Sequence, residues 1–239
     1  MSDQALRHLE AAWRASGSVE DEAAWLLERV RVGDLETEKL EMAAYCGHEA
    51  ASVVQGDRAS IRASAARADA DSAQTWIQLP PLVPKASIVA TARMIEAAHA
   101  LFVDKQSEDP LLEGQRAVVS SVLERAMRTP FESVPPEQES QVQGWLQDSD
   151  FASDDLREAG RGYLLGALFQ LCQATTALGS DDLAKSRVAC GDAAVCSEGL
   201  VSLAFGCEEH DYECDHDPSA WLISEACLRV ITHALSPSS

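Results

Sequence analysis

The eleven residues from Cys207 to Asp217 hold the densest set of groups in this chain that could do chemistry. They contain two thiols, two imidazoles and six carboxylates, with no Lys or Arg. Two cysteines and two histidines form a ligand set that tetrahedral zinc uses. The segment is therefore a candidate site for zinc or another soft metal, with four candidate ligands: Cys207, His210, Cys214 and His216. A loop that holds no cofactor is nevertheless the interpretation that we favour.

Two other interpretations of this segment stay open. Familiar zinc sites separate two ligand pairs by about a dozen or more residues, so a solvated acidic loop with incidental Cys and His competes with the metal site. Cys190 or Cys196 could also replace one ligand. A calcium loop fits less well, because His216 and Leu222 occupy the positions where an EF-hand needs Gly and Glu.

Catalysis by a thiol in this segment is disfavoured. A nucleophilic cysteine needs a lowered pKa, whereas the surrounding carboxylates would raise it. The sequence also lacks the G-x-x-x-x-G-K phosphate loop, the H-E-x-x-H zinc motif and the G-x-S-x-G nucleophile motif. We expect a protein that is not an enzyme.

The composition predicts a helical, strongly acidic protein. Of the 239 residues, 46% are hydrophobic but only 5% are aromatic, and Ala and Leu dominate, which favours helices packed through small side chains. The formal net charge is −20. This charge argues against nucleic acid and anionic membranes as partners, and favours another protein with a basic or neutral surface.

The cysteines and the N-terminal residues indicate a cytoplasmic setting. The first residues show no signal-peptide pattern, so we expect the seven cysteines to be reduced. Cys172 and Cys227 lie in apolar helical patterns and are expected in the core. The most apolar run, 162–178, contains two Gln and is too short and too polar for a membrane span, so we expect a buried helix.

Helix start and stop signals recur along the chain. Ser18 is a candidate N-cap, Gly33 a candidate stop, and the Ser-Asp-Asp sequences that end at Asp155 and Asp182 are candidate caps of long helices. Another helix is expected to begin at Pro110. The predicted fold is all-α: a multi-helix bundle or a helical-repeat-like array of roughly ten helices with no significant sheet.

The same signals predict a division into three segments. Residues 1–55 form a small helical subdomain, and residues 56–84 form a linker or partly helical connection, interrupted by the prolines near residue 80. Residues 85–239 form a larger helical bundle.

Residues 27–51, with Gly33 and Gly47 between short helices, resemble a helix–Gly–helix–Gly unit of uncharacterised all-helical bacterial proteins. The resemblance covers a minor part of the chain and carries no catalytic motif. It implies an α fold and a bacterial cytosolic setting. The Cys207–His216 segment is not part of that pattern.

Two functions follow as expectations. The first is a non-enzymatic acidic helical module for protein–protein interaction, such as an adaptor, an inhibitor or an immunity-type protein. The alternative is a metal-binding or metal-sensing protein that uses the Cys207–His216 segment.

Overall fold

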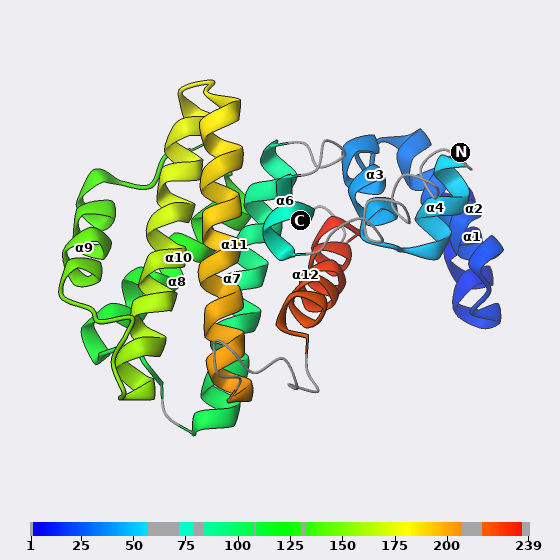
Figure 1. Cartoon of the computed structure of the whole chain (residues 1–239). Helices are drawn as coiled ribbons and strands as arrows, with labels where there is room; N and C mark the ends of the chain where they lie inside the picture. The colour runs from blue at the N-terminus through cyan, green and yellow to red at the C-terminus, as the bar shows by residue number, and fades with distance from the viewer. Residues whose placement is uncertain are drawn as a thin grey trace. The chain divides into compact units, whose positions relative to one another are not determined.

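The protein is all-helical. The computed structural model describes residues 2–56, 72–78, 84–107, 109–130, 132–206 and 217–235. These ranges contain eleven helices and no strand, which confirms the predicted fold class (Figure 1).

The chain forms two compact units. One comprises residues 1–69 and 227–239, and the other comprises residues 70–226. The boundary thus falls inside the last helix, α12 (Pro218–Leu235), whose C-terminal part belongs to the first unit. The three-segment division expected from the sequence stays a prediction.

The first unit is built from short helices with local stop signals. They are α1 (Ser2–Ser16), α2 (Val19–Val32), α3 (Thr37–Tyr45) and α4 (Glu49–Gln55). The Ser18 side chain accepts the N–H of Asp21 at 3.1 Å, and Gly33 ends α2 at a φ of 79°. Both signals act as predicted, because a hydroxyl satisfies a free N–H and only glycine adopts this φ without strain.

The core of the first unit is aliphatic and includes one residue from the end of the chain. Small side chains dominate it, so the helices approach one another closely. Its buried residues are Ala23, Leu26, Leu35, Leu40, Ala43, Ala44, Ala50, Ala51 and Ala234.

A buried arginine fastens the end of α12 within the first unit. Arg29 is 1% exposed, and its Nε donates to Asp34 Oδ2 at 2.6 Å. Its Nη1 donates to the carbonyl oxygen of Leu235 at 2.7 Å. The guanidinium also lies 4.8 Å from the ring centroid of Trp25, which stacks on Trp13. A cation near the last helical carbonyls is favourable because those carbonyls carry partial negative charge.

The second unit contains the long helices. They are α6 (Ala73–Gln78), α7 (Pro84–Gln106), α8 (Glu113–Arg128), α9 (Pro136–Gln147), α10 (Leu156–Gly179) and α11 (Leu183–Phe205). Helix α11 packs against α10, α7 and α6, and α10 packs in turn against α9, α7 and α8 (Figure 1). Asp155 and Asp182 cap α10 and α11 as predicted.

Two elements of the second unit differ from the expectation in detail. Helix α8 begins at Glu113 rather than at Pro110, because the Gln115 side chain accepts the N–H of Leu112 and sets the start there. Helix α6 lies within the expected connection, and its Trp76 is fully buried.

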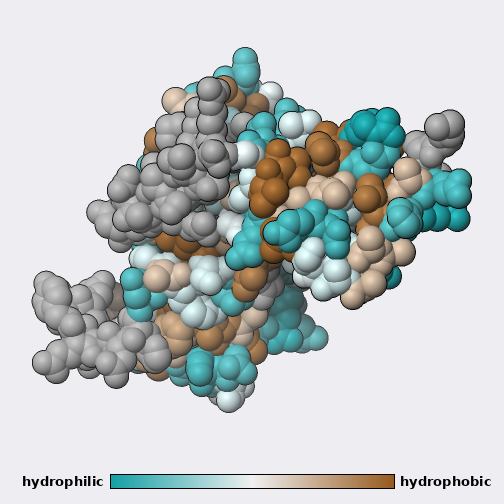
Figure 2. Space-filling model, turned by 90° about the vertical axis from the view of Figure 1, so that its right-hand side faces the viewer, coloured by the Kyte–Doolittle hydropathy of each residue, from teal (hydrophilic) through white to brown (hydrophobic). Residues whose placement is uncertain are grey.

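Helices α7 and α11 are long and apolar enough, by length and composition, to cross a membrane. The core helices of a folded bundle pass the same test, and 67% of the most apolar stretch of α7 is buried within the protein. On the face drawn in Figure 2, hydrophobic residues reach the surface between hydrophilic ones, as is usual for a folded protein.

Glycines let the long helices of the second unit approach closely. A Cβ at Gly160 of α10 would lie 2.6 Å from the Phe102 ring of α7, which is fully buried. A Cβ at Gly199 of α11 would lie 2.3 Å from the Tyr163 ring of α10. In contrast, a Cβ at Gly144 of α9 would meet nothing within 4 Å.

We expect Gly160→Ala to lower the free energy of unfolding by about 1–3 kcal/mol, because the buried Phe102 ring has no space into which to move. Gly144→Ala, the matched control in another helix, should raise it by about 0.5–1 kcal/mol. Urea unfolding followed by circular dichroism measures both. A Gly160→Ala protein as stable as the parent would contradict the tight contact.

Candidate functional site

The four predicted metal ligands, Cys207, His210, Cys214 and His216, lie outside the described residues. Within the part of the chain that the structure describes, no group of three or more His, Cys, Asp or Glu side chains gathers as a metal site. The zinc site therefore stays a prediction.

Of the five described cysteines, four are buried and Cys196 is partly exposed. Cys172 and Cys227 are buried, which confirms the expectation for both. Burial raises the pKa of the Cys172 and Cys190 thiols to about 12, with a further contribution to Cys172 from Glu139. Burial and then Asp192 raise the pKa of Cys196 to about 11. These thiols stay protonated at neutral pH and are poor nucleophiles.

The most connected polar cluster of the second unit centres on Asp109, between α7 and α8. Its Oδ1 accepts the Leu111 N–H at 2.9 Å and lies 3.1 Å from Nε2 of His99 on α7. Its Oδ2 lies 2.8 Å from Nε of Arg116 on α8. The backbone carbonyl oxygen of Asp109 accepts a hydrogen bond of 3.1 Å from Nε of Arg157, which lies in the first turn of α10. One residue thus joins three helices.

The cluster stabilises the ionised form of the Asp109 carboxyl. Burial of the carboxyl opposes ionisation, but the Leu111 N–H, the His99 imidazole and the Arg116 guanidinium together keep the pKa below its usual value. A carboxylate that accepts several hydrogen bonds is stabilised in its charged form.

A cavity of about 290 Å³ opens beside this cluster. The side chains of His99, Asp109, Arg116 and Ser120 contribute to its polar lining. An imidazole oriented by a carboxylate is also part of a Ser-His-Asp triad. However, within the described residues the Ser120 hydroxyl makes no hydrogen bond to His99, and Arg116 shares the carboxylate.

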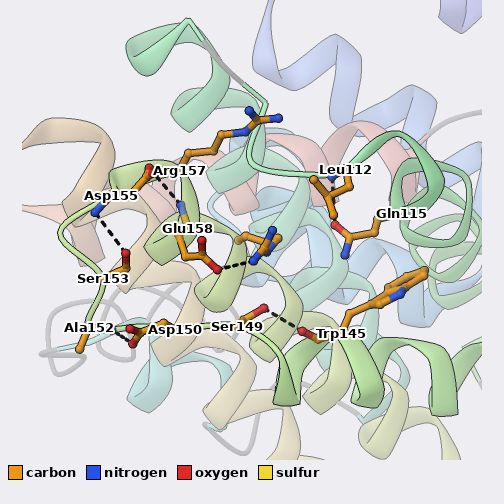
Figure 3. A network of polar contacts seen from close by, with 11 residues as sticks. Leu112, Gln115, Trp145, Ser149, Asp150, Ala152, Ser153, Asp155, Arg157 and Glu158 are labelled. Atoms are coloured by element: carbon orange, nitrogen blue, oxygen red, sulfur yellow. Dashed lines mark hydrogen bonds and ion pairs between the residues drawn. The ribbon is translucent and has the colours of Figure 1, made fainter.

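A second feature comprises α9, the turn between α9 and α10, and the first residues of α10. We name residues 132–158 the acidic segment, because they contain eight carboxylates and one basic side chain, Arg157. Asp150 accepts the Ala152 N–H at 3.0 Å, and Asp155 caps α10 by accepting the Arg157 N–H at 2.9 Å. Figure 3 shows these contacts, with Arg157 extending away from the turn toward the chain that leads into α8.

Two large apolar side chains stand exposed within the acidic segment. Phe151 is 41% exposed and Leu156 is 46% exposed. The ring of Phe151 lies edge-on to Tyr163, with the centroids 5.4 Å apart, and packs over Gly162 and Gly166 of α10. These contacts cover one side of the Phe151 ring, and the other side is exposed to solvent.

Signals for the Asp109 cluster are present in the sequence, although the predictions above did not include it. His99 is the one imidazole in the apolar helix 84–106, and Asp109-Pro110 is typical of a turn. Neither signal indicates that Arg116 would share the same carboxylate, because that depends on how α7 and α8 pack. The acidic segment was visible in the sequence only as part of a general excess of acids after residue 100.

No family model, curated protein or solved structure matches the chain. The resemblance of residues 27–51 to bacterial helix–Gly–helix–Gly proteins therefore stays a prediction.

We expect Asp109→Asn to lower the thermal stability at neutral pH, because the amide cannot replace the charge that His99 and Arg116 face. The folded protein lowers the Asp109 pKa, so its contribution is present above the unfolded value of 3.8 and disappears as the pH falls through the lower folded value. The difference in Tm between the parent and the variant should therefore shrink below about pH 4. Scanning calorimetry between about pH 2.5 and about pH 7 measures it, with Asp148→Asn as an exposed control. A difference that is constant with pH would contradict the assignment.

Proposed function

We propose that this protein is a non-enzymatic interaction module, which uses the acidic segment to bind another protein with a basic and partly apolar surface. An adaptor, an inhibitor or an immunity-type protein are the roles that such a module fills. The setting we propose is the cytoplasm, with neither nucleic acid nor membrane as the partner.

One observation carries the proposal: exposed Phe151 and Leu156 lie among eight carboxylates with a single arginine between residues 132 and 158. The guanidinium of that arginine donates to the Asp109 carbonyl at 3.1 Å. The segment therefore presents two exposed apolar side chains in a stretch rich in negative charge, in which Arg125 pairs with Glu132 and Arg161 with Glu158.

These two properties have different roles in binding. Carboxylates at the rim of an interface speed the encounter with a basic partner and reject acidic ones. Apolar and aromatic side chains at the centre supply most of the affinity once they are desolvated. Phosphate backbones and anionic lipids would be repelled by the same rim.

We expect Asp148→Asn with Asp154→Asn to weaken the complex by about 2- to 30-fold at low salt, since each exposed pair contributes about 0.2–1 kcal/mol. Glu38→Gln with Glu41→Gln, on exposed positions of α3, makes the same change in net charge and should leave binding unaltered. Cross-linking in native cells, followed by titration of the purified partner at low and high salt, measures both. Equal losses in the two double variants, or no specific partner, would overturn the proposal.

A metal-binding function is the second candidate, and it rests on the two cysteines and two histidines within ten residues, 207–216. We expect the purified, unchelated protein to contain about one equivalent of zinc by elemental analysis, because the ligand set suits a closed tetrahedral site. Cys214→Ser should lose the metal, whereas Cys227→Ala, in the buried part of α12, should retain it. A metal-free protein after zinc addition with reduced thiols would exclude this function.

A further inference from the structure

The cavity between α7 and α8 is lined by both charged and apolar side chains, none of which belongs to the acidic segment. From this lining, we propose that the cavity binds a primary ammonium group on a short alkyl stem, the chemistry of a lysine side chain or of a free alkylamine. The site is separate from the proposed interaction surface, since the cavity is lined by α7, α8 and their connection.

Of the three carboxylates that line the cavity, two form ion pairs with described residues and one does not. Asp109 faces both His99 Nε2 at 3.1 Å and Arg116 Nε at 2.8 Å. Glu96 pairs with Nη1 of Arg93 at 2.7 Å. Glu124 also lines the cavity and forms no ion pair within the described residues. The polar lining therefore has one uncompensated negative charge.

The rest of the wall is apolar. Leu111, Val119 and Leu123 are buried, and Met127 lies one turn beyond Leu123 on the same helix. A lysine-like side chain matches such a surface, because its methylene groups cover apolar atoms while its ammonium group reaches an acid. At about 290 Å³, the cavity lies at the small end of the range for ligand sites.

Anionic ligands fit less well. Among the described residues, the lining contains one arginine, Arg116, and its guanidinium is already paired with Asp109. A carboxylate or phosphate would have to compete with Asp109 and approach Glu96 and Glu124. Like charges in a partly enclosed site disfavour this approach.

The test is a nuclear magnetic resonance titration of the ¹⁵N-labelled full chain with three probes. They are Nα-acetyl-lysine amide, pentylamine, and Nα-acetyl-norleucine amide, which keeps the apolar stem but lacks the ammonium group. We expect the two amines to shift the amides of Leu111, Leu123 and Met127, and the norleucine probe to shift them far less. Tighter binding of the lysine probe than of pentylamine would identify a peptide as the source, and the reverse a free amine.

The matched variants are Glu124→Gln and Glu113→Gln, both on exposed positions of α8, of which only Glu124 lines the cavity. Glu124→Gln should weaken binding of the amines about two- to fivefold, and Glu113→Gln should leave it unchanged. The amide spectrum itself shows whether each variant is folded.

Three results would overturn the inference. The first is equal binding of the norleucine and lysine probes, and the second is unaltered binding in Glu124→Gln. The third is a set of shifts confined to Arg128, Thr129 and Glu132, which line a neighbouring open groove that shares Ser120 and Glu124 with the cavity.

Discussion

The close approach of long helices through small side chains is the constraint on which the second unit depends. With aromatics at 5% of the chain, large side chains cannot fill wide gaps between helices. Helix α11 instead contacts α10, α7 and α6 at once, and glycines stand where the neighbours are bulkiest. Gly199 faces Tyr163, and Gly191 faces the end of the Gln78 side chain, which belongs to α6. Close packing of this kind gains dispersion energy over the whole contact and tolerates little added volume.

Among its described residues, the first unit contains one buried charge, the guanidinium of Arg29. Its short helices carry an aliphatic core of small residues, and a guanidinium in such a core is costly unless it is well paired. Arg29 meets part of this requirement through Asp34, the carbonyl of Leu235 and the face of Trp25, whereas its Nη2 is buried without a hydrogen-bond partner among the described residues. The contact joins residues 206 positions apart in the chain. It brings the end of α12 into the same core as α2, so the first unit combines the N-terminal helices with the last turns of α12.

The rigid framework of the second unit positions two features that face outward. Asp109 ties α7, α8 and α10 together, and the cavity opens beside this cluster. The acidic segment, residues 132–158, ends just after Arg157, which is its one basic side chain. Both proposals therefore share one physical origin, an excess of acids held in fixed places by helices that pack tightly behind them.

The sequence alone determined the elements whose signals are local. Ser18, Asp155, Asp182 and Gly33 start or end helices through contacts within about one turn, so their effect could be predicted without knowing the fold. Apolar periodicity likewise predicted the all-α class. The start of α8 was misplaced by a few residues, because Gln115 competes with Pro110 for that role.

Only the tertiary structure decided which distant residues meet. It buried Trp76 of α6 in a segment that the sequence presented as a connection. It also brought His99 and Arg116 to one carboxylate, and Arg29 to the carbonyl of Leu235. Such contacts have no local signal, since they depend on the relative position of whole helix faces. Those positions follow from the volumes of many small side chains together, which no short stretch of sequence specifies.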